Sequence, residues 1–180
     1  MTGATPVERV DADGLDDGSL DQLGEVLHAC VEAGASVGFV PPFSPADARR
    51  YWEDVRGSLV PGERVLLVAR QDRRIVATAQ VMLAMPANGR HRAEVGKVLV
   101  HPGARRSGLG RALMAEVEEV AREYGRSLLV LDTVTDSAGE LLYRAIGYEP
   151  AGAIPGYALS TRGVLEATRV MFKVLPPVSG

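Results

Sequence analysis

The sequence predicts a mixed α/β domain in which helices cover both faces of a central, mostly antiparallel sheet that contains one splayed parallel strand pair. Three observations lead to this fold class. Short runs rich in Val, Ile and Leu alternate with segments in which apolar residues recur every three or four positions. Three strand-like runs follow one another with short links, as in an antiparallel meander. A helix separates the next strand from its predecessor, which predicts a parallel pair.

The composition limits the class of protein. A chain of 180 residues can form one domain with a substantial core, so we expect a single domain over residues 1–180. The hydrophobic fraction of 46% and the charged fraction of 24% are typical of a soluble globular protein. A net charge of −3 argues against a nucleic-acid-binding protein, and the chain has neither a signal segment nor a long apolar run. We therefore expect a cytoplasmic protein that binds neither nucleic acid nor membranes.

Cysteines and histidines are few. Cys30 is the only cysteine, and the histidines at positions 28, 91 and 101 are scattered without ligand spacing, so we expect neither a disulfide nor a metal site. Five aspartates crowd residues 11–21. They could attract a cationic amine, but a solvated start of a helix is the favoured interpretation.

The N-terminal third predicts one short strand followed by two helices. Residues 7–12 alternate apolar and polar side chains. Apolar residues then recur at helical spacing after Ser19, a candidate cap, until Gly34, which can end the helix. Ser44 and Pro45 together open the second helix.

The rest of the chain predicts most of the sheet. Two strand-like runs separated by three polar residues indicate a β-hairpin, and a polar link leads to a third strand. A helix separates this strand from a fourth, which we expect beside it and parallel to it. The expected elements are strands over 64–70, 74–84, 95–100 and 128–133, a helix over 138–147, a last pair of strands around Tyr157 and over 167–174, and disordered tails over 1–6 and 176–180.

The stretch from Glu94 to Tyr124 carries the clearest functional pattern. A strand rich in β-branched residues stops at Pro102, and an amphipathic helix follows it. The loop between them contains residues 105–110, Arg-Arg-Ser-Gly-Leu-Gly. Glycines let the backbone approach a ligand closely, and the first N–H groups of a helix have no partner within the helix. With the helix dipole and two guanidiniums, these groups favour a pyrophosphate. Glycines before a helix can also serve only a turn.

Three phosphate-binding patterns compete for this loop. A Walker loop is excluded because the chain contains no Gly-Lys-Ser/Thr triplet. A dinucleotide fold gains support from Asp132, which ends a strand-like run about 20 residues beyond the loop. However, Leu113 stands where the third glycine should be, and five residues separate Pro102 from Gly108 in place of a tight turn. The third pattern, Arg/Gln-x-x-Gly-x-Gly/Ala, fits residues 105–110.

This third pattern resembles the coenzyme A loop of the GNAT superfamily of N-acetyltransferases, and the flanking KVLVHP and RALM are similar to the sequence around that loop. The segment SAGELLYRAIGYEPAG is similar to the family's second coenzyme-binding motif. Many members carry Asn where Asp136 or Ser137 stands here, so Ser137 is the remaining candidate for the contact to the pantetheine arm. The resemblance covers roughly residues 64–174, and the string that begins at Leu131 resembles the tabtoxin-resistance-type branch.

The resemblance implies a GNAT-like fold, acetyl-CoA as cosubstrate, no metal, a small-molecule amine as acceptor, and a homodimer of the kind common in the family. Tyr143 falls at the position that serves as the acid in many members. We assign Glu94 as the base, alone or through a water, with His91 in reserve. The Val100 N–H is expected to polarise the acetyl carbonyl. The predicted coenzyme-binding residues are Leu99, Val100, Arg105, Arg106, Ser107, Gly108, Leu109, Gly110, Arg111, Ser137 and Tyr143.

The acceptor site is expected from residues outside these motifs. The candidates for the acceptor site are Phe39, Trp52, Asp132 and Tyr157. Phe43 and Tyr51 lie near the first two in the sequence and are further candidates. For the aromatic residues, a role in the core is the alternative. We expect direct transfer of an acetyl group to a primary amine in a ternary complex, without an acetylated Cys30. A non-catalytic acyl-CoA-binding module and, more remotely, a nicotinamide dehydrogenase are the alternatives.

Overall fold

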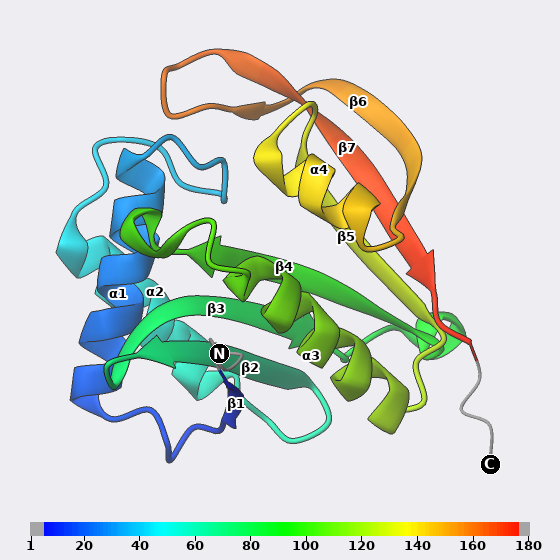
Figure 1. Ribbon diagram of the computed structural model, residues 1–180, viewed down its shortest axis with the longest axis horizontal. Coiled ribbons are helices and arrows are strands. Elements are labelled where there is room, and N and C mark those ends of the chain that lie inside the picture. Colours follow the sequence, from blue (N-terminus) through cyan, green and yellow to red (C-terminus); the bar gives the residue numbers. More distant parts are fainter. Residues whose placement is uncertain (1–5, 177–180) are drawn as a thin grey trace.

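A seven-stranded mixed sheet forms the centre of the computed structural model, which describes residues 6–176 (Figure 1). The strands are β1 (Val7–Val10), β2 (Arg64–Gln71), β3 (Arg74–Met82), β4 (Arg92–Val100), β5 (Leu128–Val134), β6 (Glu149–Leu159) and β7 (Leu165–Val174). The helices are α1 (Asp17–Glu32), α2 (Pro45–Gly57), α3 (Leu109–Glu123) and α4 (Ala138–Ala145). The predicted tails over 1–6 and 176–180 lie outside the described residues, apart from Pro6 and Pro176.

The strand order β1-β2-β3-β4-β5-β7-β6 confirms the predicted fold class. Every neighbouring pair is antiparallel except β4 and β5, which are parallel. A doubly wound dinucleotide fold requires a mostly parallel sheet, so this alternative is wrong. None of the described helices is both long and apolar enough to cross a membrane.

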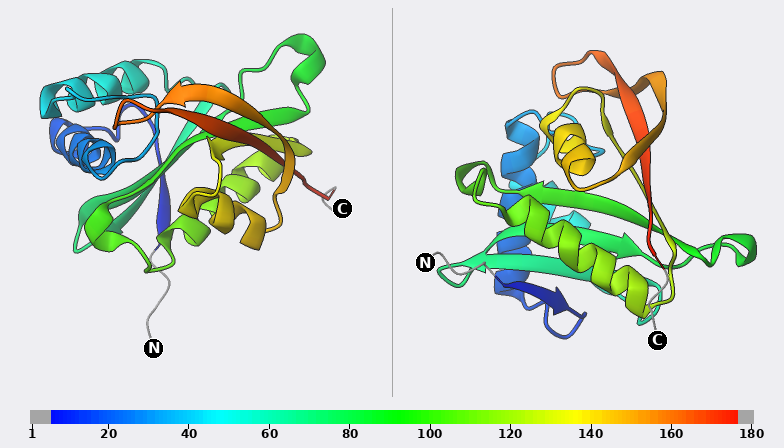
Figure 2. Two further views of the ribbon diagram at one scale, coloured as in Figure 1. Left: turned by 90° about the horizontal axis from the view of Figure 1, so that it is seen from above. Right: turned by 45° about the vertical axis from the view of Figure 1, so that its right-hand side comes forward.

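The helices lie in two layers on opposite faces of the sheet, which Figure 2 shows from two directions. Helices α1 and α2 cover one face and share a core with Leu66, Val68 and Leu99 of the sheet. Helices α3 and α4 cover the other face, where Leu113 and Val117 pack against the inward side chains of β2 to β5. The helical recurrence of apolar residues therefore builds two cores, one on each face.

The predicted helix boundaries hold except at the start of α1. Asp16, with an extended backbone, accepts a hydrogen bond from the Ser19 N–H at 2.7 Å, so Asp16 is the cap and Ser19 is a buried residue of the first turn. The prediction of Ser19 as the cap was wrong because either residue type can cap and only the backbone decides between them. Gly34 follows the helix at φ +88°, and Ser44 caps α2 as expected.

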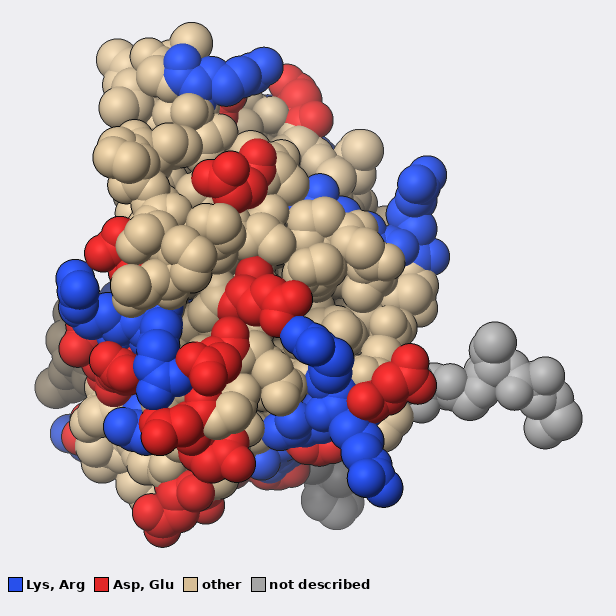
Figure 3. Space-filling model, turned by 90° about the vertical axis from the view of Figure 1, so that its left-hand side faces the viewer, with Lys and Arg blue, Asp and Glu red and all other residues tan. Residues whose placement is uncertain are grey.

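Two of the N-terminal aspartates form ion pairs with the second helix. Arg49 of α2 pairs with Asp17 at 2.9 Å and also with Asp21, both on α1. Figure 3 shows the acidic and basic side chains of this side of the molecule intermingled. Asp16 caps α1, and Asp17 and Asp21 remain largely exposed while they pair with Arg49, which agrees with the predicted solvated start of a helix.

A buried carboxylate anchors α4 to the sheet. Glu140 is only 3% exposed, and its side chain accepts a hydrogen bond from the Asp136 N–H at 2.8 Å. Its other oxygen pairs with Arg144 at 2.7 Å and with Arg169 of β7 at 2.8 Å. The Asp136 hydrogen bond and the two guanidiniums lower the pKa of Glu140 to about 2, although burial acts in the opposite direction.

Replacement of Glu140 by glutamine should therefore destabilise the fold. We expect Glu140→Gln to lower the free energy of unfolding by about 2 kcal/mol at pH 7, because it leaves two guanidiniums near a neutral group. The folded pKa lies below the ordinary 4.5, so the wild-type advantage is present above about pH 4.5 and is lost as the pH falls towards 2.

Chemical denaturation at several pH values measures this difference. Glu119→Gln is the matched control, because Glu119 is exposed and pairs only with Arg122 one turn away, and it should change stability by less than about 0.5 kcal/mol. An equal effect of the two substitutions would contradict the anchoring role of Glu140.

Candidate active site

The central feature of the site is the opening between β4 and β5. The two strands pair only at their first steps, where Arg92, Ala93 and Glu94 lie opposite residues 128–130. Beyond Glu94 they separate, which confirms the predicted splay. The expectation that 95–100 runs alongside 128–133 was wrong for most of that length, because the paired part of β4 begins earlier, at Arg92.

An extra residue in β4 accompanies the separation. Gln80 of β3 lies opposite Gly96, but Thr78 lies opposite Leu99, so β4 carries one residue more than β3 over this interval. Lys97 sits in this bulge with φ +50°, a left-handed conformation that is uncommon for a residue with a side chain. A bulge bends its strand and increases the local twist, which turns the end of β4 away from β5.

The opening exposes backbone groups at the end of β4. The His101 N–H donates to Val76 of β3 at 2.8 Å. Because N–H groups alternate in direction along a strand, the Val100 N–H points away from β3, towards the opening. The Val100 carbonyl, on the same side, accepts from Cys30 Sγ and Arg105 Nε, each at 3.4 Å. Leu99 directs its amide towards β3, and its side chain is buried.

The arginine and glycine loop ends at the start of α3 without a side-chain cap. Gly108 is the N-cap residue, at φ +84°. The first N–H of α3 with a backbone acceptor is that of Ala112, which donates to Gly108 at 3.0 Å. Arg105, Arg106 and Gly108 are exposed beside these free N–H groups. Free N–H groups and guanidiniums at one place could hold a ligand phosphate, and phosphate binding by this loop stays a prediction.

The loop also lies directly against α4. A Cβ atom added to Gly110 would come within 2.9 Å of Leu142 Cδ2. Glycine at this position therefore permits close packing between the start of α3 and the helix that carries Tyr143. Ser107, within the loop, donates its hydroxyl to the Ala104 carbonyl at 2.6 Å. The predicted phosphate loop and the second predicted motif thus form one continuous border of the opening.

Tyr143 supplies a protonated hydroxyl from α4. Its side chain is 7% exposed and lies against Tyr148, with 5.8 Å between the ring centroids. Its hydroxyl makes no hydrogen bond to the described part of the chain. Burial and, to a smaller extent, the charge of Asp132 raise the pKa of Tyr143 to about 12. The hydroxyl therefore stays protonated at neutral pH and is available as a donor.

Two predicted carboxylates share the opposite, open face of the sheet. Ala93 and Leu131 pack into the core on the α3 side, so the alternation of side chains directs Glu94 and Asp132 to the α1 side. Both are exposed. Asp132 lies two residues beyond the last paired step of β5, whereas Glu94 lies at that step. Five residues of strand lie between Glu94 and Val100, a separation of about 20 Å along the strand, so Glu94 reaches a group held at Val100 neither directly nor through a single water.

The predicted aromatic residues divide between the opening and the core. Phe39 is half-buried in the α1–α2 loop, with its ring centroid 5.3 Å from that of Tyr51. Trp52 is completely buried in the core below Tyr51. Trp52 therefore packs and does not line the opening, because its position one step along α2 turns it towards the sheet. Tyr51, whose hydroxyl accepts from Gln80 at 3.0 Å, lies closer to the opening.

The remaining predicted residues lie on the α4 and β6 side. Ser137 caps α4, where its hydroxyl accepts from the Glu140 N–H at 3.2 Å. Tyr157 is 57% exposed in β6, at the shift of register between Ile154 and Ala158. In Figure 1 the β6–β7 hairpin reaches over towards the α1–α2 loop. No group of three or more His, Cys, Asp or Glu side chains within residues 6–176 has the arrangement of a metal site.

Sequence reasoning missed Lys97, which the bulge directs towards Phe39 and Tyr51. A signal for it exists in the composition. All but two of the twenty Lys and Arg residues are arginines, and Lys97 interrupts an apolar run in the strand that precedes the loop. Neither observation could show that the strand contains an extra residue there.

Two comparisons by sequence match this chain to acetyltransferases. The profile of the family described as "Acetyltransferase (GNAT) family" matches residues 31–148. An uncharacterized N-acetyltransferase of Azospirillum brasilense, from the hisH-hisA intergenic region, is 40% identical over 136 residues, which are 73% of this chain and 76% of that protein.

Solved structures with the same fold are more distant in sequence. A phosphinothricin acetyltransferase from Sinorhizobium meliloti, in complex with acetyl-CoA, aligns with a TM-score of 0.76 at 19% identity, over 99% of this chain and 95% of that one. A putative acetyltransferase from Salmonella typhimurium, also with acetyl-CoA, aligns with a TM-score of 0.75 at 18% identity, over 99% and 98%. A ribosomal-protein-alanine N-acetyltransferase from Brucella melitensis gives 0.74 at 23%, over 94% and 99%.

Gly108 should tolerate no side chain without loss of stability. We expect Gly108→Ala to lower the free energy of unfolding by about 1 kcal/mol, because alanine is strained at φ +84° although the space around it is open. Thermal unfolding measures the change. Gly57→Ala is the control, since Gly57 also has open space but no positive φ, and it should show no loss. A Gly108→Ala protein as stable as wild type would contradict the left-handed loop.

Proposed function

The chain belongs to the GNAT family and is an N-acetyltransferase, and on this basis we propose that it transfers an acetyl group from acetyl-CoA directly to a primary amine of a small molecule, in a ternary complex. The observation that carries the proposal is the opening between β4 and β5. The uncapped start of α3 borders it at one end, and the hydroxyl of Tyr143 and the carboxylate of Asp132 lie beside it.

The coenzyme would bind along this opening. The loop 105–111 would hold its pyrophosphate through the free N–H groups of α3 and the guanidiniums of Arg105 and Arg106. The unpaired backbone of β4 and β5 would meet the two amides of its pantetheine arm in the manner of an added strand. Leu99, Val100 and Ser137 border that path. When bound, acetyl-CoA supplies the thioester that is to be cleaved.

Residues of the chain would then act on the two ends of the reacting group. The Val100 N–H is free to donate to the acetyl carbonyl oxygen, whose negative charge grows as the amine nitrogen attacks the carbonyl carbon. The carbon–sulfur bond breaks, and the Tyr143 hydroxyl gives its proton to the departing sulfur. Glu94 is the proposed base for the proton of the attacking amine, and because of its distance from Val100 it would act only through a chain of several waters.

The acceptor would enter from the α1 side of the sheet. Asp132 presents an exposed carboxylate on this face, close to Tyr143, and an ammonium group would be attracted to it. Phe39 supplies apolar surface nearby, and Tyr157 is exposed on the hairpin that reaches across. Four points stay predictions: that the acceptor is a small molecule, that the chain belongs to the tabtoxin-resistance-type branch, that it forms a homodimer, and that it is cytoplasmic.

Binding of acetyl-CoA and turnover of an amine together test the proposed function. We expect acetyl-CoA and CoA, but neither ATP nor NAD, to raise the unfolding temperature. At about 100 times its dissociation constant, a ligand of the folded state adds roughly 2.7 kcal/mol. Thiol release in the presence of a panel of amines then measures transfer. Absence of stabilisation by both CoA compounds would contradict the coenzyme site.

The hydroxyl of Tyr143 should matter for turnover and not for binding. We expect Tyr143→Phe to lower kcat about 100-fold, within the range for loss of a general acid, while stabilisation by acetyl-CoA persists. Tyr124→Phe is the matched control, because Tyr124 is 41% exposed at the far end of α3, and its kcat should not change. An unchanged kcat in Tyr143→Phe would remove the role of Tyr143 as the acid.

A further inference from the structure

Lys97 has no ionic partner within residues 6–176, although its side chain is half-buried. It forms neither a hydrogen bond nor an ion pair with any described residue. The other lysine of the chain, Lys173, is fully engaged: it pairs with Glu118 at 2.6 Å and donates to the Ile146 carbonyl at 2.8 Å. The difference matters because an enclosed charge is costly unless it is paired.

Aromatic rings form one side of the surroundings of Lys97. Its Nζ lies 5.7 Å from the ring centroid of Phe39 and 5.5 Å from that of Tyr51. Rings at this distance attract a cation without supplying a counter-charge. Burial lowers the pKa of Lys97, which the charge of Asp132 partly offsets, and Arg64 lowers it further. The ammonium therefore lies in a setting that an added anion would stabilise.

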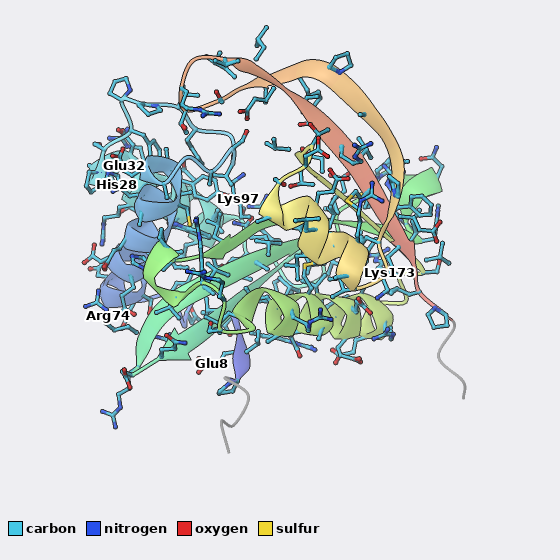
Figure 4. The ribbon with its side chains drawn as sticks, turned by 45° about the horizontal axis from the view of Figure 1, so that its top comes forward. Glu8, His28, Glu32, Arg74, Lys97 and Lys173 are labelled. Atoms are coloured by element: carbon cyan, nitrogen blue, oxygen red, sulfur yellow. The ribbon has the colours of Figure 1, made fainter. Side chains whose placement is uncertain are left out.

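The other side of Lys97 faces the opening. The bulge places Lys97 on the α1 side of the sheet, the side that also carries Glu94 and Asp132. Figure 4 labels it between α1 and the start of α4. Asp132 is near enough to influence the pKa of Lys97 and yet forms no ion pair with it. The open face therefore presents a positive and a negative group that are separated from each other.

We propose that Lys97 binds a carboxylate of the acceptor, so that the substrates are amino acids or other amines that carry a carboxylate close to the amino group. This inference rests on the proposed function. The ammonium of such an acceptor lies towards Asp132 and its carboxylate towards Lys97, two groups of opposite charge that form no ion pair with each other. The rings of Phe39 and Tyr51 hold the Lys97 ammonium in place before the acceptor arrives.

A binding site of this kind discriminates strongly. An acceptor without the carboxylate leaves the enclosed ammonium of Lys97 unpaired, and sites with buried polar groups reject such analogues more effectively than apolar pockets do. Lys97 is also distinct from the phosphate site, because three residues of β4 and then the His101 turn separate it from the loop 105–111. Its contribution should therefore affect the acceptor and not the coenzyme.

Matched pairs of acceptors test the proposal. The common L-amino acids and their carboxamides are supplied to the wild type with acetyl-CoA, and we expect a kcat/KM at least about tenfold higher for the acids. In Lys97→Gln we expect KM for the acids to rise about tenfold or more, with KM for the amides changed less than about twofold. Lys97→Arg should restore part of the difference.

Controls separate this role from effects on folding and on the coenzyme. Gln, Arg and Lys are all unbranched at Cβ, so the strain at φ +50° is similar in each variant. Arg50→Gln removes a positive charge from α2 at a side chain that is 69% exposed, and it should leave the preference for acids unchanged. Stabilisation by acetyl-CoA in thermal unfolding should be the same in Lys97→Gln as in the wild type.

Several outcomes would overturn the proposal while the proposed function stands: equal turnover of acids and amides by the wild type, an unchanged preference in Lys97→Gln, or loss of acetyl-CoA stabilisation in that variant. Absence of turnover with every amine would instead contradict the proposed function. In that case, calorimetric titration of the amino acids into the CoA-bound protein tests the role of Lys97 without any need for turnover. Binding that weakens about tenfold in Lys97→Gln supports the proposal, and no binding to the wild type overturns it.

Discussion

The parting of β4 from β5 is the constraint on which the rest of the site depends. Only three residue pairs join the strands, and the one-residue bulge at Lys97 then bends β4 away. This single departure from regular pairing leaves the Val100 N–H without a partner in β5. It also turns a charged side chain to the face where Glu94 and Asp132 lie. A regular parallel pair would have closed the opening and satisfied the same backbone groups internally.

Contacts on the α3 side compensate for the lost pairing. The continuous antiparallel pair β5–β7 and the pair β6–β7, which has two register shifts, join the C-terminal strands to one another. Leu142 packs against Gly110, and Glu140 connects α4 to Arg169 of β7. The width of the opening is thereby fixed by the packing of α4 and not by hydrogen bonds across the opening. Tyr143 directly follows Leu142 on α4, so the same contacts position its side chain.

Local patterns made much of this architecture predictable. The loop and α3 could be predicted because their signals are local. Gly108, Gly110, the paired arginines and the apolar stripe of the helix all determine structure over about ten neighbouring residues. Two strands joined by a crossover helix usually lie parallel in the same sheet, and this rule predicted the one parallel pair, β4 and β5. The bulge at Lys97 was not predictable, because it depends on the register between two strands. The burial of Trp52 against Tyr51 is likewise a property of the tertiary packing, since both residues fit the same aromatic pattern.

The choice of lysine at position 97 follows from the same geometry. Guanidinium groups serve the surface pairs of this protein, and arginine supplies nearly all of its positive charge. In the opening, the cation lies over two aromatic rings and must leave space for a ligand beside it. A compact ammonium on a flexible stem meets this requirement, whereas a planar guanidinium would stack on the rings and extend further towards Asp132. Lysine thus leaves room for a ligand between the two charges.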